Sequence, residues 1–386
     1  MTGDLRDRTA IVGIGHSGAA RDLGVLPGVY TTTTCVQAIR DAGLELSDID
    51  GITTLPPQTP PGYNDPDVSY MIEQLGLPGV RWYGTGLGGG VGPGLIGDAA
   101  IALATGQCNY VLAFRTMVAP RPGMTYNYMG KDGASGPLAF TLPYGLGVFM
   151  QYFAPWYRRY RYERGLTDEQ MGAYVVAMRD NASRNERAVF RTPITMDEYL
   201  ASPFVCEPLR RFDCDLPVDV CGAFVMTTAE RAKDLAQQPV YVSAVSTGTG
   251  PRPDMIFWHD YTQSAGYFAG SSLWEGSGLS PSDMDFAMMY DGFAPLVLLG
   301  LEEYGLVPQG EVGAFLESGA HRAGGALPLN PHGGNNSEGR SHAIGHVVEA
   351  TLQLRGQAGT RQVPGAEACM INGGALKLAG AAVLHT

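Results

Sequence analysis

Residues of the types that transfer protons follow apolar or glycine-rich runs in the last third of the chain. Tyr290 and Asp291 end an apolar run, His332 precedes two glycines, and His342 follows a second glycine-containing segment. Tyrosine, aspartate and histidine can each accept or donate a proton at a reacting centre. We therefore take these four residues as candidate site residues.

Each candidate also has a structural interpretation. Tyr290 can be a core tyrosine with a satisfied hydroxyl, and Asp291 is better suited to capping a helix than to orienting a neighbour. His342 and His346 are four residues apart, which would place both on one helical face and would suit a metal pair. No carboxylate–histidine zinc motif surrounds them, so we predict no metal site.

The elements that must position these residues alternate between strands and helices. In the first part of the chain, the predicted elements are strands at 10–15, 47–52 and 110–114 and helices at 31–41 and 94–105. Gly43 provides a glycine C-cap for the first helix. This order predicts an α/β sheet.

The same pattern recurs later in the chain. Strands are predicted at 223–226, 240–243, 286–290, 368–371 and 381–384, and a helix at 294–305. We predict two related α/β halves that meet near residue 235, one spanning 1–235 and the other 236–386. Residues from about 117 to 205 are richer in aromatics and arginine and are interpreted as a helical insertion in the first half, although some of these arginines could instead meet a nucleotide phosphate.

Composition narrows the function classes. The chain has 386 residues, of which 45% are hydrophobic and 17% charged, with a formal net charge of -12. This negative charge argues against nucleic acid and anionic membrane surfaces as partners, because both attract basic patches. The six cysteines are scattered, without metal-site spacing or a dense disulfide pattern. With no signal peptide or apolar run of membrane-spanning length, a reduced cytoplasmic setting is expected.

Several segments together resemble, in chain order, the sterol-carrier and lipid-transfer branch of the thiolase superfamily. Tyr290-Asp291-Gly292-Phe293 stands at the place of a His-Asp-Cys-Phe type motif, and Asn372-Gly373-Gly374 resembles the final glycine loop. The other matching segments are 10–15, 41–44, 48–51, 191–203, 208–214 and the Asn-Pro-x-Gly-Gly loop at 330–334 with 337–339. The resemblance implies a layered α-β-α-β-α arrangement of the two halves.

The chain departs from this family at its reactive positions. The thiolase nucleophile is a cysteine before a buried helix, and counting back from the strand at 110 places that position at about Gly89. Glycine carries no nucleophile, so no acyl-enzyme can form there. The loop histidine is replaced by Arg340, with His342 two residues on. In the last loop Met370 or Ile371 stands where a general-base cysteine would lie, next to Cys369.

These departures resemble the aldolases of steroid side-chain degradation. The resemblance implies retro-aldol cleavage of a β-hydroxy acyl-CoA, with no bound cofactor and CoA as part of the substrate. His342 would be the base or proton relay and Tyr290 would position the hydroxyl, with Asp291 and His332 nearby. The candidate contacts to the CoA ester are Gly89, Gly90, Arg340, Gly373 and Gly374. Residues 258–261 are either substrate-binding chain or a surface loop.

The same resemblance implies a homodimer core and a separate OB-fold, zinc-ribbon partner protein that would complete a heterotetramer. Two other function classes stay open. One is a thiolase-like acyltransferase that uses unfamiliar catalytic residues. The other is a non-catalytic subunit that binds lipid or acyl-CoA.

Overall fold

Apolar strands that alternate with helices build the first half as the sequence predicts. The computed structural model describes residues 5–55, 66–85, 91–120, 136–250, 263–374 and 378–386. Helix α1 begins with Pro27, whose fixed φ suits the first turn, and the chain leaves it through Gly43 at a φ of +75°. The first-half elements are β1 (Thr9–His16), α1 (Pro27–Asp41), β2 (Gly51–Thr54), α2 (Val68–Leu75), β3 (Trp82–Thr85), α3 (Val91–Ala104), β4 (Tyr110–Met117), β7 (Val220–Thr228) and α7 (Ala229–Ala232).

The second half repeats this alternation. Its elements are β8 (Val240–Gly248), α8 (Ala265–Ser277), β9 (Phe286–Met288), α9 (Leu296–Glu303), α10 (Val312–Glu317), α11 (Gly334–Ser337), α12 (Ile344–Leu354), β10 (Ala368–Gly373) and β11 (Ala379–His385). Every predicted strand and helix is present, with bounds shifted by a few residues. The sequence analysis did not indicate α2, β3, α7, α8, α10, α11 and α12.

Hydrogen bonds join the strands of both halves into one nine-stranded sheet in the order β3-β2-β4-β7-β1-β8-β11-β10-β9. The junction is short, because β1 and β8 pair only at Ala10 with Tyr241 and at Ile11 with Val240. The strands of the two predicted halves are therefore joined in one continuous sheet.

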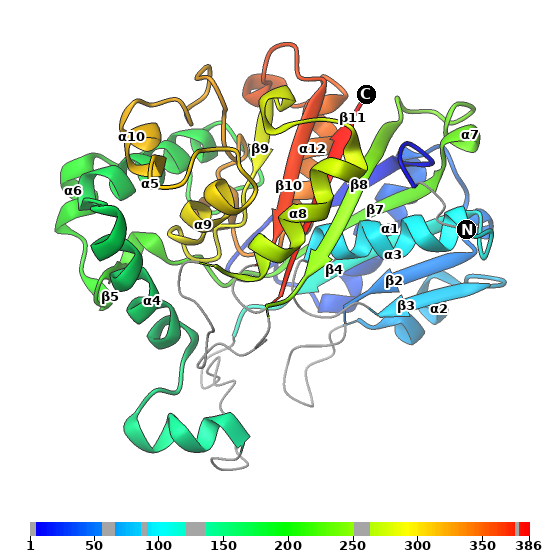
Figure 1. Ribbon diagram of the computed structural model, residues 1–386. Coiled ribbons are helices and arrows are strands. Elements are labelled where there is room, and N and C mark those ends of the chain that lie inside the picture. Colours follow the sequence, from blue (N-terminus) through cyan, green and yellow to red (C-terminus); the bar gives the residue numbers. More distant parts are fainter. Residues whose placement is uncertain (1–4, 56–65, 86–90, 121–135, 251–262, 375–377) are drawn as a thin grey trace.

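Helices cover both faces of each half and fill the space between them (Figure 1). One apolar cluster packs α1 and α2 on β2, β4 and β7, and a second packs α8 and α9 on the strands of the second half. A third lies between the halves, where α3 and α12 contact strands of both. This gives the layered α-β-α-β-α arrangement of the thiolase fold, as predicted.

The segment between β4 and β7 forms a helical cap on the second half (Figure 1). It contains α4 (Phe149–Arg164), α5 (Asp168–Ser183), α6 (Met196–Ala201) and a small hairpin of β5 (Phe204–Cys206) and β6 (Leu209–Arg210). The described arginines of α4 lie beside carboxylates: Arg158 beside Glu207, Arg159 beside Glu163, Arg161 beside Asp168 and Arg164 beside Glu302. These pairs support the interpretation of the segment as a helical insertion rather than as a phosphate site. None of the described helices combines the length and apolar character needed to cross a bilayer.

A buried ionic cluster ties the cap to the second half. Arg187, which follows α5, lies 3.3 Å from the Glu338 carboxylate and donates to Glu349 at 2.7 Å. Arg361 donates to Glu349 through two nitrogens at 3.0 Å. Burial alone would raise the pKa of Glu338, but the Arg187 charge, with help from His332 and His16, lowers it to about 2. Both carboxylates are therefore ionised and depend on these arginines for charge balance.

Removal of Arg187 tests this cluster. Arg187→Leu should reduce the free energy of unfolding by about 3–5 kcal/mol, because it leaves two buried carboxylates with reduced compensation. Denaturant unfolding of both proteins measures the difference. The matched control is Arg158→Leu, whose ion pair with Glu207 is exposed on both sides, so a loss of at most about 1 kcal/mol is expected. Equal losses in the two variants would contradict a structural role for the cluster.

Candidate active site

The loop between Asn330 and Ala343 has an unusual backbone. Asn330, His342 and Ala343 have positive φ values of 44°, 53° and 65°, and Gly333, Gly334 and Gly339 also lie in this region. At Gly334 a Cβ would lie 2.0 Å from an oxygen of Asp291. The paired glycines of the motif are thus required by conformation and by the close approach of this carboxylate.

Asp291 holds this loop in place. Its carboxylate accepts hydrogen bonds from the backbone N–H of Asn335 at 2.7 Å and of Asn336 at 3.4 Å, and from the Tyr174 hydroxyl at 3.0 Å. The two backbone donors open α11, so Asp291 caps a helix that lies far away in the sequence. Burial raises the pKa of Asp291 to about 7, although the hydrogen bonds act in the opposite direction. The capping interpretation of Asp291 thus describes its geometry.

Asn330 connects the hydrogen bonds around Asp291 to the end of strand β9. Its side-chain oxygen accepts from Met289 N–H at 2.7 Å, and its amide donates to the Tyr174 hydroxyl at 2.9 Å and to the Met289 carbonyl at 2.7 Å. Tyr174 was not among the predicted site residues. It lies on α5 of the cap, and nothing in its local sequence indicates that it contacts a residue 117 positions away.

Tyr290 lies two residues after the end of β9 and is partly exposed. Its backbone N–H donates to the side-chain oxygen of Asn372 at 2.6 Å. Gly292 is buried beside it, and its α-carbon faces the phenol ring. The loops predicted to meet at residues 290 and 372 are therefore in contact.

His332 lies deeper, inside the ionic cluster. It is fully buried, its ring packs edge-on against His346 with centroids 4.9 Å apart, and its Nε2 is 3.6 Å from Glu338. Burial lowers its pKa. This position favours a structural role for His332 over contact with a substrate.

His342 occupies a different environment. It is partly exposed and precedes α12, which begins at Ile344. Because His342 and Ala343 have positive φ, His342 and His346 do not share a helical face, and the expectation from their spacing is wrong. The first turn of α3 is close by, since a Cβ on Gly92 would lie 2.7 Å from the Ala343 carbonyl oxygen.

Two arginines surround His342 with positive charge. Burial, followed by the charges of Arg115 and Arg340, lowers the pKa of His342 well below 6.5. Arg340 also lies 3.7 Å from the Asp215 carboxylate, whose pKa burial raises to about 6. His342 is therefore neutral at pH 7, because burial and the charges of the two arginines both oppose its protonation.

The sequence reasoning missed Arg115. It is 2% exposed on β4, two residues after Ala113, and so shares the face of that strand that packs on α3 and α12. An arginine inside an otherwise apolar strand was the signal that could have identified it.

The predicted glycine contacts are only partly described. Gly373 ends β10 and Gly374 follows it at a φ of 72°, next to Asn372 and therefore close to Tyr290. Gly89, Gly90 and residues 258–261 lie outside the described residues.

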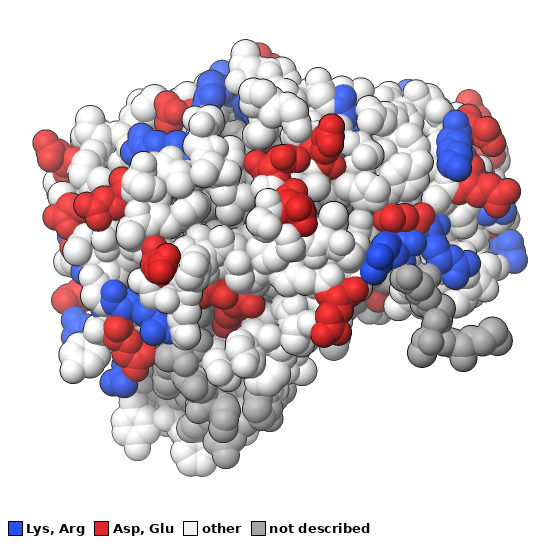
Figure 2. Space-filling view, turned by 45° about the horizontal axis from the view of Figure 1, so that its top comes forward, with Lys and Arg blue, Asp and Glu red and all other residues white. Residues whose placement is uncertain are grey.

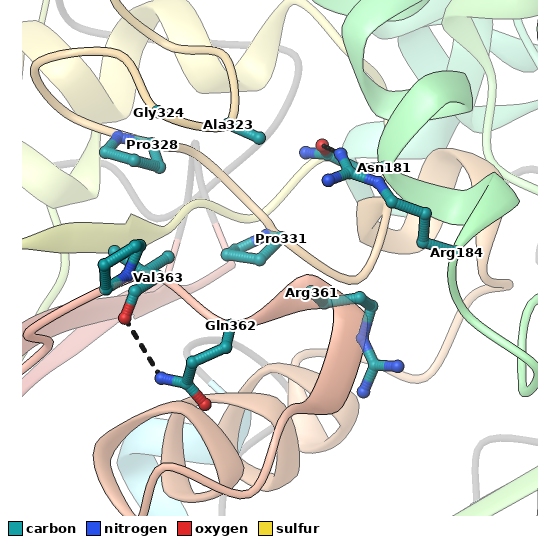
Figure 3. A pocket seen from close by; sticks show the side chains of 10 residues that line it. Asn181, Arg184, Ala323, Gly324, Pro328, Pro331, Arg361, Gln362 and Val363 are labelled. Atoms are coloured by element: carbon teal, nitrogen blue, oxygen red, sulfur yellow. Dashed lines mark hydrogen bonds between the residues drawn. The ribbon is translucent and has the colours of Figure 1, made fainter.

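A small cavity of about 30 Å³ lies beside the ionic cluster, at the start of the loop between Asn330 and Ala343 (Figure 3). Asn181 and Arg184 of the cap face Arg361, Gln362 and Pro331 across it. Its volume suits one or two waters and is far too small for an acyl-CoA. We therefore do not assign it to the substrate.

Comparisons with known proteins agree with this geometry. The thiolase C-terminal domain-like family matches residues 253–386. The chain is 33% identical to the 17-hydroxy-3-oxo-4-pregnene-20-carboxyl-CoA lyase of Mycobacterium tuberculosis, over 96% of this chain and 97% of that protein. It is also 33% identical to a steroid side-chain-cleaving aldolase of Thermomonospora curvata, over 91% of each chain.

Solved structures show the same relationship. The Ltp2-ChsH2(DUF35) aldolase superposes with a TM-score of 0.90 and 31% identity, over 99% of this chain and 98% of that one. Human mitochondrial 3-ketoacyl-CoA thiolase shares the fold, with a TM-score of 0.69 at 14% identity. The chain belongs to the thiolase superfamily, in the branch that contains the steroid side-chain-cleaving aldolases.

Proposed function

We propose that this protein cleaves a β-hydroxy acyl-CoA thioester by a retro-aldol reaction, with a steroid side chain as the acyl group. The observation that carries the proposal is the Tyr290-Asp291-Gly292 segment, which has a tyrosine and a glycine where the thiolase motif has a histidine and a cysteine. The near full-length similarity to two proteins named as a lyase and an aldolase on steroid substrates supports it.

The reaction needs proton transfer and charge stabilisation but no covalent nucleophile. A base removes the β-hydroxyl proton, and the electron pair of the O–H bond forms the new carbonyl. The Cα–Cβ bond breaks, and its electron pair moves into the thioester enolate. A proton then adds to Cα, which gives a ketone or aldehyde and a shortened acyl-CoA without any oxidant or reductant.

The electropositive region suits the enolate. The charges of Arg115 and Arg340 that disfavour protonation of His342 would favour a negative charge formed beside it. The amino-terminal end of α3 adds partial positive charge from the helix dipole. In this arrangement neutral His342 relays the hydroxyl proton and Tyr290 positions the hydroxyl group.

Four of the six cysteines, Cys35, Cys108, Cys221 and Cys369, are buried, and Cys206 and Cys214 are partly exposed. Burial raises the pKa of Cys108 to about 12 and also raises that of Cys214, whereas hydrogen bonds with neighbouring side chains lower the pKa of Cys221. A thiol that stays protonated is a weak nucleophile. These observations favour the aldolase over a thiolase-like acyltransferase.

The assembly is also part of the proposal. The relative solved as the Ltp2-ChsH2(DUF35) aldolase supports a partner of the DUF35 kind, which we expect to have an OB-fold and a zinc ribbon. A homodimer core, a heterotetramer with that partner and a cytoplasmic location remain predictions from the family resemblance. The outer edge of the sheet at β3, where Tyr83 is 70% exposed, could pair with a second copy.

The activity is tested with a panel of β-hydroxy acyl-CoAs that includes steroid side chains. The expected products are a carbonyl compound and a shortened acyl-CoA, with no acyl group on any cysteine by mass spectrometry. Prior alkylation of accessible cysteines should leave the rate largely intact. The matched control is a panel of β-keto acyl-CoAs with free CoA, which should not be consumed. An acyl-cysteine found during turnover would refute the proposal.

The roles of His342 and Tyr290 are separable by mutation and pH. His342→Ala should lower kcat by ~10²-fold or more with little change in substrate binding. Because the pKa of His342 lies well below 6.5, His342 stays neutral down to a lower pH. The acid limb of the pH–rate profile, where protonation of His342 slows the reaction, should therefore lie below pH 6.5. Arg340→Gln removes a positive charge, raises the pKa of His342 and should move this limb to higher pH.

Arg231→Gln, an exposed change on α7, is the control for the pH profile. An acid limb that does not move in Arg340→Gln would contradict the electrostatic role of Arg340. If His342→Ala keeps its full rate and Tyr290→Phe loses it, the two roles are reversed. If neither change matters, the site lies elsewhere.

The partner is tested by purification. The chain expressed alone is expected to be poorly soluble or weakly active, and to co-purify with an OB-fold, zinc-ribbon protein when both are produced together. Adding that protein should raise the rate on the same substrate. Full activity from the isolated chain would count against a required partner.

A further inference from the structure

The Tyr290 ring lies in the space that a side chain at position 292 would occupy. A Cβ built on Gly292 would be 2.7 Å from the Tyr290 hydroxyl oxygen and 2.9 Å from two ring carbons, Cε1 and Cζ. Contacts this short do not occur between non-bonded heavy atoms of these types, so one of the two groups would have to move. The phenol hydroxyl thus occupies space that a side chain at 292 would need.

A positive φ does not explain why this residue is glycine. The φ of Gly292 lies outside the left-handed region that favours glycine, in contrast to Gly333, Gly334 and Gly339. The three atoms nearest to a Cβ at this position all belong to Tyr290, so the Tyr290 ring is the obstacle that a side chain would meet first.

The backbone cannot easily shift to relieve the contact. Tyr290 N–H is bonded to Asn372 at 2.6 Å, and the Gly292 carbonyl accepts from Asp215 N–H at 3.2 Å. Between them, the Asp291 carboxylate is bonded to α11 and to Tyr174. A side chain at 292 would therefore displace the tyrosine ring rather than the chain.

We infer that Gly292 is a positioning residue for the reaction, because the absence of its side chain fixes where the Tyr290 hydroxyl lies. This inference rests on the role proposed for Tyr290. It also explains why the two departures from the thiolase motif occur together. A tyrosine at 290 can hold this orientation only if position 292 has no side chain.

The test is a double-mutant cycle on the protein with its partner. Gly292→Ala should lower kcat by ~10²-fold, as much as Tyr290→Phe, with little change in KM. In the Tyr290→Phe background, adding Gly292→Ala should cost almost nothing more, because the hydroxyl that it would misplace is already gone. Gly79→Ala is the control, since a Cβ there meets no atom within 4 Å and its φ is ordinary.

The outcomes separate the inference from the proposed function. Full activity of Tyr290→Phe would overturn the role of Tyr290 itself. Loss of activity in Tyr290→Phe with full activity in Gly292→Ala would overturn only the inference, as would losses that multiply in the double variant.

A second cycle measures the contact without activity. The Tm loss caused by Gly292→Ala should be clear in the wild-type background and should largely vanish in the Tyr290→Ala background, where no ring remains. This measurement stays decisive if Gly292→Ala is too unstable to assay for turnover. An equal Tm loss in both backgrounds would show that the ring is not the obstacle and would overturn the inference.

Discussion

The buried ionic cluster around Glu338 and Glu349 is the interaction on which the site depends. Two ionised carboxylates that are buried away from bulk water require cations close to them. Arg187 and Arg361 provide these cations from different parts of the chain. The need for charge balance therefore fixes the cap, the loop before α12 and the segment after α12 relative to one another. His16, at the end of β1, lies 4.0 Å from Glu338 and brings the first half into the same cluster.

Because the ionic cluster holds Glu338 in place, the loop between Asn330 and Ala343 can keep a strained backbone. Positive φ at Asn330, His342 and Ala343 costs free energy that isolated chain could not sustain. The Asp291 carboxylate accepts hydrogen bonds from the backbone at the start of α11, and the Asn330 side chain bonds the backbone of Met289, which offsets this cost. His342 therefore lies outside the helix that follows it, and the next residue, Ala343, lies against the start of α3.

The chemistry of the site depends on the charge and shape of the side chains that this loop and its neighbours hold. The fold is shared with a thiolase at 14% identity, so the frame itself does not select the reaction. What differs is the set of side chains at the site. Tyr290 lies beside Gly292, and the charges of Arg115 and Arg340 act on neutral His342. Figure 2 shows acidic and basic side chains interspersed on one face of the molecule.

The sequence by itself determined many of the strands and helices, because apolar runs and glycine stops are local signals that burial later respects, and the family resemblance implied their layered order. It also placed Tyr290 and His342 in two loops, which the structure connects through the hydrogen bonds of Asn335 to Asp291 and Ser341. It took both His332 and His342 as candidate site residues, and only the tertiary structure put His332 inside an ionic cluster and left His342 partly exposed. Arg115, Tyr174 and the single continuous sheet were likewise decided there. Ion pairs and hydrogen bonds between residues more than a hundred positions apart leave no periodic trace in the sequence.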